Sequence, residues 1–370
     1  MSSIRLFSAV FMMIFSSATL AAIEVPLKAP AGYYRAVQGK NITTFSCPLP
    51  PTPYTGDLNF PSKYEGDAPS KDTINKAAEK RYTNATAAFR QFEKGIIKLA
   101  ETAIKKGKSD APVECMVQWY TTWIDANALV KGQTNHIGKA VRKWALGSAS
   151  TAWLRVKLAA DSPYQHLPKE NIAKIEKWLN TIALLVVEDY QNRGTKKANN
   201  HDYWAAWSVM ATAVILNDHA LFEKSANIYE MAMTQIDKDG FLPNELTRNT
   251  RALGYHSFAL QPLSMMHVFL TANNHSAAAI GKGKLEKLTQ NVLLGINDPK
   301  PFADKTGFKQ ITDQTHSCSS LAWIEPLHTA FPNLCMAQSL ARCRPMLSTR
   351  MGGNMTTLFA NNVKDQVLSH

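Results

Sequence analysis

Sites for a bound metal ion are the first feature that the sequence lacks. No pair of cysteines has CxxC spacing, and no cluster of histidines has the spacing of a zinc site. The segment DKDGFLPNEL resembles a calcium-binding loop only in part, because with Gly240 in the sixth position the twelfth is Leu246 rather than an acid. We therefore expect neither a metal ion nor a cofactor.

Hydrophobic runs long enough to cross a membrane are also absent. The apolar run from Leu6 to Phe15 follows a single cation, Arg5, and precedes the small residues SSATLAA. This order is typical of a secretory signal peptide, here residues 1–22, and the run is too short for a membrane span. We expect an exported protein with no membrane span, located in the periplasm.

Cysteine is scarce, and its usage fits an oxidising compartment. The five cysteines are Cys47, Cys115, Cys318, Cys335 and Cys343. Outside the cytoplasm such residues form disulfides, so we expect one or two disulfides and at least one free thiol.

Long alternating stretches, which would indicate half-buried strands, are missing as well. From Lys71 onward apolar residues recur every three or four positions, as on one face of a helix. Further helical patterns cover 114–131, 137–160, 168–191, 201–217, 220–236, 246–273, 282–294 and 318–342. Short loops join them and no repeat has a fixed period, so we predict an all-α fold, a single (α/α) toroid (incomplete α/α barrel) of antiparallel helical hairpins. This domain would span residues 23–370 and include an irregular arm and lid at 23–70, which is rich in Pro, Gly, Tyr and Ser.

Acidic residues are fewer than basic residues in this chain. The chain has 41 Lys and Arg against 29 Asp and Glu, a net charge of +12. A basic exported protein usually meets an anionic partner, which could be a polyanionic glycan, a membrane surface or a nucleic acid.

The stretch NNHDYWAAW, residues 199–207, combines a helix cap with groups that can do chemistry. Asn199 or Asn200 would cap the helix, which leaves the other amide free. His201 would lie in the first turn, where the positive end of the helix dipole disfavours imidazolium and favours an anion. A capped helix with a structural histidine is the simpler interpretation.

A second candidate cluster lies in residues 240–260. Arg248, Arg251 and Tyr255 have spacing i, i+3 and i+7, which would place two guanidinium groups beside one phenol on one helix face. Cations near a tyrosine favour the phenolate, so we predict a lowered pKa for Tyr255. Two weaker segments are FPSKYEGD, with Lys63 and Tyr64, and TNHIGKAVRKWA, whose Lys143 reads as part of a solvated face.

Taken together, seven segments resemble the mannuronate-specific alginate lyases of polysaccharide lyase family 5, periplasmic enzymes of alginate-producing bacteria. They are PAGYY (30–34), SCPLPPTPYTG (46–56), SKYEG (62–66), NHIGKAVRKWALGS (135–148), NNHDYWAAWSVMATAV (199–214), GFLPNEL (240–246) and RALGYHSFAL (251–260). The resemblance implies an (α/α) toroid with a deep cleft, cleavage by β-elimination and no required metal. It also implies a disulfide between Cys47 and Cys115.

The resemblance also assigns roles to individual residues. The catalytic set that it implies is Asn200, His201, Arg248 and Tyr255. The substrate contacts that we expect are Ser62, Lys63 and Tyr64 in the lid, Asn135 and His136 in a sugar-contacting segment, and Arg142, Trp204 and Arg251. One departure is Asp202, where the family usually has serine, since an acid pointing into the cleft would oppose an anionic sugar.

The chemistry of β-elimination fits these residues. The C5 proton of a uronate is weakly acidic, so its removal requires that the carboxylate charge be neutralised, a task for Asn200, Arg248 and His201. In mannuronate H5 and the leaving O4 lie on the same face, so Tyr255 could serve as both base and acid. Alternatively His201 is the base and Tyr255 the acid.

Two other functions are open at this stage. A glycoside hydrolase would need two carboxylates across the bond, for example from Glu188, Asp189, Asp202 and Glu245. A non-catalytic, alginate-binding component of an export complex would explain the charge alone. We expect a monomer that binds alginate and not nucleic acid.

Overall fold

The computed structural model describes residues 25–37, 45–66, 70–105, 109–190 and 193–360. The signal peptide predicted at residues 1–22 lies outside these residues. None of the helices in the described ranges is long and apolar enough to cross a membrane.

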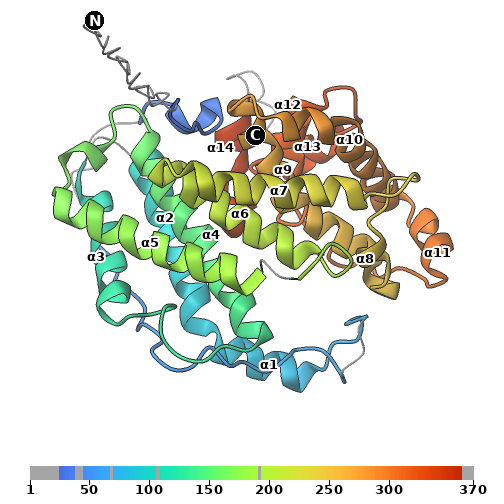
Figure 1. Ribbon diagram of the computed structural model, residues 1–370, viewed down its shortest axis with the longest axis horizontal. Coiled ribbons are helices and arrows are strands. Elements are labelled where there is room, and N and C mark those ends of the chain that lie inside the picture. The colour runs from blue at the N-terminus through green and yellow to red at the C-terminus, as the bar shows by residue number, and fades with distance from the viewer. Residues whose placement is uncertain (1–24, 38–44, 67–69, 106–108, 191–192, 361–370) are drawn as a thin grey trace, which may run out of the picture.

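In the part of the chain that the structure describes, eight long helices pack in two layers (Figure 1). The inner helices are α2 (Ala87–Lys105), α4 (His136–Leu158), α6 (Asn200–Leu216) and α9 (Ala252–Ala272), and each packs on the next. The outer helices are α3 (Ala111–Asp125), α5 (Lys169–Tyr190), α7 (His219–Gln235) and α10 (Ser276–Asn297). Only two residues separate α6 from α7 and three separate α9 from α10, so these pairs are antiparallel hairpins.

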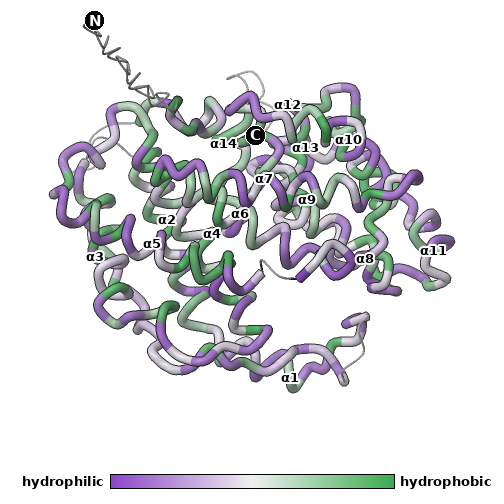
Figure 2. The backbone as a smooth tube through the Cα atoms, viewed as in Figure 1, coloured by the Kyte–Doolittle hydropathy of each residue, from purple (hydrophilic) through white to green (hydrophobic). Residues whose placement is uncertain are grey.

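The inner position of α6 follows from its composition. Nearly every residue from Asn200 to Ile215 is buried, and α4, α5, α7 and α9 all contact this helix. A helix that is apolar on all sides is stable only when neighbours surround it. Figure 2 shows hydrophobic residues gathered where α2 and α4 pack together.

Short elements complete the chain. They are α1 (Lys76–Ala85), α8 (Pro243–Leu246), α11 (Lys300–Thr306), α12 (Ile324–Ala330), α13 (Ala337–Cys343), α14 (Met355–Phe359), the 3-10 turns η1 (Ala31–Tyr34), η2 (Pro163–His166), η3 (Asn249–Arg251) and η4 (Thr349–Met351), and the strands β1 (Leu347–Ser348) and β2 (Gly353–Asn354).

The C-terminal part of the chain closes the ring of inner helices. The turn η4 contacts α2, α4 and α9, while β2 contacts α2 and α12 contacts α9. The first and last inner helices are thus joined through residues 324–359. The all-α prediction is confirmed, and the arrangement is an incomplete (α/α) toroid.

Two predicted helices are interrupted. The pattern at 246–273 predicted one helix, but α9 begins only at Ala252 because Asn249 adopts a left-handed conformation with φ of 48°. The pattern at 318–342 yields α12 and α13 with a turn between them. The two-residue strands β1 and β2 pair as an antiparallel hairpin, which the sequence pattern did not predict.

Two disulfides tie loops to the helices. The Cys47–Cys115 bridge fastens the N-terminal arm to α3, which confirms the pairing that the resemblance implied. The Cys318–Cys343 bridge joins the segment before α12 to the end of α13. Cys335 is an exposed free thiol, so the expected cysteine usage is also confirmed.

Candidate functional site

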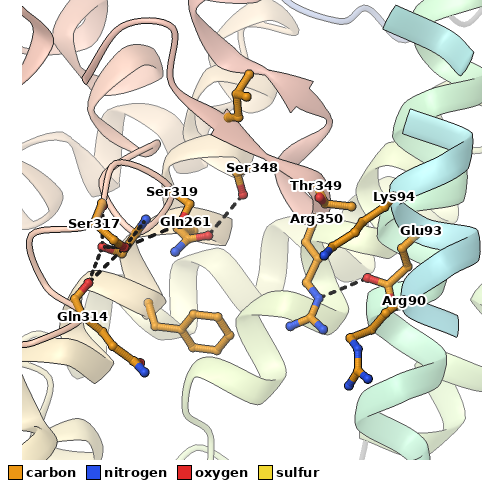
Figure 3. A pocket seen from close by; sticks show the side chains of 13 residues that line it. Arg90, Glu93, Lys94, Gln261, Gln314, Ser317, Ser319, Ser348, Thr349 and Arg350 are labelled. Atoms are coloured by element: carbon orange, nitrogen blue, oxygen red, sulfur yellow. Dashed lines mark hydrogen bonds and ion pairs between the residues drawn. The ribbon is translucent and has the colours of Figure 1, made fainter. Parts of the chain in front are cut away.

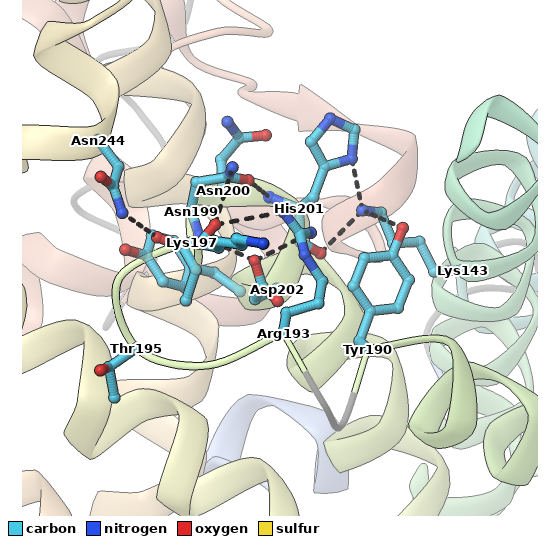
Figure 4. A network of polar contacts seen from close by, with 12 residues as sticks. Lys143, Tyr190, Arg193, Thr195, Lys197, Asn199, Asn200, His201, Asp202 and Asn244 are labelled. Carbon is cyan, nitrogen blue, oxygen red and sulfur yellow. Dashed lines mark hydrogen bonds and ion pairs between the residues drawn. The ribbon is translucent and has the colours of Figure 1, made fainter. Parts of the chain in front are cut away.

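The start of α6 is held by a capping box. The side chain of Asn199 accepts a hydrogen bond from the His201 backbone N–H at 3.0 Å, and the Asp202 carboxylate accepts one from the Asn199 N–H at 2.8 Å. Arg193 pairs with the same carboxylate at 3.1 Å. Asp202 is therefore buried against the start of its own helix, where its carboxylate is paired with the capping N–H and with Arg193 (Figure 4).

A fully buried carboxylate, Glu245, joins two of the expected catalytic residues. It accepts hydrogen bonds from the Asn200 backbone N–H at 2.6 Å and from the Asn200 side-chain amide at 3.0 Å. Its other oxygen lies 3.7 Å from Nε of Arg248. Glu245 comes from α8, a single turn that Pro243 begins. This carboxylate therefore orients the amide and the guanidinium together.

The phenol of Tyr255 lies between a cation and a second phenol. The guanidinium carbon of Arg248 is 4.8 Å from the centre of the Tyr255 ring, and the Tyr64 hydroxyl is 2.6 Å from the Tyr255 hydroxyl. The expected lowering of the Tyr255 pKa is not found. Burial raises this pKa, followed by the charge of Tyr64 and the hydrogen bond with it, and together they outweigh Arg248, which lowers the pKa.

Arg251 does not share the position of Arg248. Because α9 starts after it, its side chain turns to the segment before α1 and donates from Nε to the backbone oxygen of Asp72 at 2.7 Å. The predicted pair of guanidinium groups flanking one phenol is thus reduced to Arg248 alone, and Arg251 holds the segment that joins the arm to α1.

The imidazole of His201 is packed among cations. Lys143 lies 2.8 Å from its Nδ1, and the His136 ring is 5.0 Å away between ring centres. Burial, followed by the charge of Lys143, lowers the pKa of His201 well below its ordinary value. The imidazole is therefore neutral at neutral pH, as the position at the helix start predicted.

The lid segment reaches the site through Tyr64. The Tyr64 N–H donates to the Ser62 hydroxyl at 3.2 Å, and Nζ of Lys63 lies 5.3 Å from the Tyr64 ring centre. Tyr64 also bridges to Ile74 in an isolated antiparallel pair. Ser62 and Lys63 thus shape the turn that brings Tyr64 to Tyr255.

Three other expected substrate contacts have structural partners instead. Asn135 caps α4 and donates to the Phe60 backbone oxygen at 2.9 Å, so its amide anchors the arm. Arg142 is buried between Asp189, at 2.8 Å, and a backbone oxygen. Trp204 is only 2% exposed and packs on Phe258, so it offers no face for a sugar ring. His136 at the first turn of α4 is exposed.

A polar pocket of about 440 Å³ adjoins this cluster (Figure 3). Arg90 and Lys94 from α2 and Arg350 from η4 line one side, and Gln314 with nearby serines lines the other. Arg350 lies 4.0 Å above the ring of Trp144, and that ring is 6.1 Å from His201. Arg350 is also paired with Glu93 at 3.2 Å. The pocket therefore extends the site with three cations.

Metal ligands are not grouped in the parts of the chain that the structure describes. Within them no three His, Cys, Asp or Glu side chains are placed to hold an ion. The arrangement instead offers an amide, a guanidinium, a neutral imidazole and a phenol, which can bind a carboxylate and move a proton.

Comparison with known proteins supplies the family. The model of the family described as alginate lyase matches residues 59–302. An alginate lyase of Pseudomonas aeruginosa is 39% identical over 337 residues, covering 90% of this chain and 91% of that protein, and one of Azotobacter vinelandii is 37% identical over 90% and 89%. Among solved structures, a tetrasaccharide complex of alginate lyase A1-III, an enzyme of Sphingomonas species A1, matches with a TM-score of 0.75 and 21% identity over 86% of this chain and 88% of that one.

Proposed function

The chain belongs to the alginate lyase family and degrades alginate by β-elimination, and from this premise we propose that Asn200, His201, Arg248 and Tyr255 carry out the reaction on polymannuronate. One observation carries the assignment. The buried Glu245 holds the amide of Asn200 and the guanidinium of Arg248 together, and that guanidinium lies over the phenol of Tyr255.

The proposed role of Asn200 and Arg248 is to neutralise the uronate carboxylate. Loss of H5 turns that group into an enolate-like dianion, which directed donors in a poorly hydrated site stabilise. Arg248 is 9% exposed and Asn200 1%, so both donors act where water screens them little. His201, neutral and beside them in sequence, would add a third donor.

Tyr255 is the proposed proton carrier. In mannuronate H5 and O4 are on the same face, so one phenol can take the proton and return it to the leaving oxygen. The C5–H bond breaks, the C4–C5 double bond forms, and the C4–O4 bond breaks as O4 gains the proton. The raised pKa suits the phenol to the acid half of this exchange, and contact with Arg248 supports the base half.

Uronates on either side of the cut would extend toward Arg90, Lys94 and Arg350. These cations line the pocket that adjoins Trp144, and their charge matches a polymer with one carboxylate per sugar. The similar A1-III enzyme has been solved in complex with a tetrasaccharide, which supports the binding of an oligosaccharide by this fold.

Location and assembly are further proposals. The N-terminal pattern and the two disulfides support export to the periplasm, where the enzyme would clear alginate as a monomer or beside an alginate export complex. Periplasmic fractionation, followed by size exclusion and co-purification with export proteins, tests each part.

A product assay tests the function. Polymannuronate, polyguluronate and hyaluronan are incubated separately with the protein, and ultraviolet absorbance of the unsaturated uronate is followed. We expect the fastest rise on polymannuronate, and reducing ends without absorbance would instead indicate a hydrolase. No reaction on polymannuronate would overturn the proposal.

The role of Tyr255 has its own test. Tyr255→Phe keeps the ring and removes the proton carrier, so the rate on polymannuronate should fall by about 10²- to 10⁴-fold. Tyr164→Phe is the matched control, because that hydroxyl lies in η2, after the C-terminal end of α4, and donates to Glu176 of α5. A Tyr255→Phe variant as fast as the wild type would exclude this mechanism.

A further inference from the structure

Lys143 is a buried lysine that makes three hydrogen bonds, two of them to His201. It comes from the middle of α4, has no exposed surface and lies beneath the first turn of α6. Its Nζ is 2.8 Å from Nδ1 of His201, 2.8 Å from the His201 backbone oxygen and 3.0 Å from the Tyr190 hydroxyl (Figure 4). The sequence pattern suggested a solvated face here, and the structure corrects that expectation.

The chemistry of an ammonium group makes this contact directional. An ammonium has three N–H donors and no acceptor, and here it meets three acceptors. The backbone oxygen can only accept, and Nδ1 must also accept if the ammonium donates to it. The single proton of the neutral imidazole must then reside on Nε2.

We propose that Lys143 is a positioning residue that fixes His201 in the tautomer protonated at Nε2, so that the imidazole donates to the uronate and does not act as its base. This inference rests on the proposed place of His201 beside the substrate. It also separates the two candidate bases, since a ring whose Nδ1 is occupied and whose Nε2 carries the proton has no free lone pair for H5.

The ammonium at this position is held by its three acceptors and by two nearby carboxylates. Burial has the largest effect and lowers the pKa of Lys143, as do Arg193 and Arg350, whereas the carboxylates of Asp202 in α6 and Asp189 in α5 favour the charged form. The other titratable neighbours of the imidazole are His136, Arg193 and Arg248, and none of their charges favours imidazolium. Asp202, already fixed in the capping box, thus supplies the negative charge beneath the Lys143–His201 pair.

Loss of a proton from Lys143 would allow His201 to adopt its other tautomer. A neutral amine gains a lone pair that can accept from Nδ1–H, so the second tautomer becomes accessible. Burial lowers the pKa of Lys143 well below its ordinary value, so this change occurs at a lower pH than in an exposed lysine. Fixed donation by His201 should therefore weaken at the alkaline end of the pH range.

Nitrogen NMR measures the tautomer directly in the wild-type protein. The full chain is labelled with ¹⁵N-histidine, and the signals of His201 are identified by their loss in His201→Gln. Between pH 6 and 8 we expect a protonated Nε2 and an unprotonated Nδ1. A protonated Nδ1, in either the neutral or the charged ring, would overturn the proposal. No substrate is needed, so the result stands apart from any failure to cleave polymannuronate.

Substitution of Lys143 tests the consequence for turnover. Lys143→Met should mix the tautomers and lower kcat on polymannuronate on the order of 100-fold with a smaller change in KM, since misplacing an imidazole proton costs up to about 10⁴-fold in other enzymes. Lys143→Arg, which keeps a cationic donor, should recover part of the loss and the Nε2–H signal.

Lys157→Met is the matched control. This lysine also extends from α4 and donates to a backbone oxygen of α6, that of Ile215 at 2.7 Å. Its other hydrogen bond is to the Glu176 carboxylate rather than to an imidazole. It should lower stability and leave kcat and the His201 signals unchanged. Unchanged kcat and tautomer in Lys143→Met would refute the proposal, and if that variant does not fold, the wild-type spectrum decides.

Discussion

Glu245 is a buried residue that holds two of the proposed catalytic groups together. Its carboxylate receives the backbone N–H and the amide of Asn200 and faces Arg248. Burial raises its pKa, while Arg248 and Asn200 lower it. A charge in this position is stabilised only by its partners, so each partner is also held in place by the charge.

Glu245→Gln should therefore weaken catalysis more than folding. The amide keeps the shape but removes the charge opposite Arg248, and the guanidinium loses its anchor. We expect kcat/KM on polymannuronate to fall by about 10- to 100-fold, a range usual for groups that orient a reacting residue. Glu188→Gln, an exposed position on α5, is the control, and equal activity of both variants would contradict this role.

Tyr64→Phe tests which group is the base. After burial, the charge of Tyr64 and the hydrogen bond with Tyr64 raise the pKa of Tyr255, so removal of the Tyr64 hydroxyl lowers that pKa and increases the phenolate fraction at a given pH. If phenolate is the base, the alkaline rise of kcat moves to lower pH. The measurement is the pH at which kcat rises, rather than the maximum value of kcat.

A base at His201 would give a different profile. Burial and Lys143 lower the pKa of His201, so a histidine base would be fully active above an acidic limb, and Tyr64→Phe would leave that limb in place. An unmoved profile would thus argue against Tyr255 as the base.

At the scale of single residues, motifs predicted the groups now proposed to react, and they did not predict the buried residues that hold those groups. Asn200, His201, Arg248 and Tyr255 could be named from their segments. Glu245 and Lys143 could not, because their partners are 45 and 58 positions away in sequence and depend on the packing of α6. No local pattern distinguishes a buried lysine from an exposed one on the same helix.

Helix α4 meets the arm through a glycine, which fixes how the elements around the site fit. A Cβ on Gly138 would lie 1.7 Å from the backbone oxygen of Leu58, whose N–H and oxygen pair with residues 133 and 135. The arm can approach this first helical turn only because no side chain is there.

Gly138→Ala should displace the arm. We expect a loss of stability of about 1–3 kcal/mol, as for other overpacked sites, and a lower kcat/KM because Tyr64 shifts with the arm. Gly147→Ala on the same helix is the control, since its added Cβ meets nothing closer than 3.6 Å. Thermal unfolding and turnover are compared, and equal behaviour of the two variants would refute this account.

Elements were largely predictable because the helical period persists through the long helices. The exceptions have local causes. The left-handed Asn249 interrupts the helix that the pattern at 246–273 predicted, and this break separates Arg251 from Arg248. Periodicity reports which residues face the core, and it does not report where the backbone turns.

For the whole molecule, the net charge of +12 should appear in the kinetics. Raising NaCl from about 50 to 500 mM shortens the Debye length severalfold, so KM for polymannuronate should increase roughly three- to tenfold while kcat changes little. A fall in kcat with constant KM would show that the charge does not act in binding. The toroid could be predicted from helix count and loop length, but its closure by residues 324–359 could not.

The closure of the ring by residues 324–359 also has a consequence for folding. The bonds from Arg155 to Gly352 and from Arg350 to Glu93 span 197 and 257 residues, so they form only after most of the polypeptide is available. Contacts this distant carry a large loop-closure entropy and are made late in folding. Arg350 also lines the polar pocket. A chain that emerges N-terminus first therefore cannot assemble this wall of the pocket until its final segment is available.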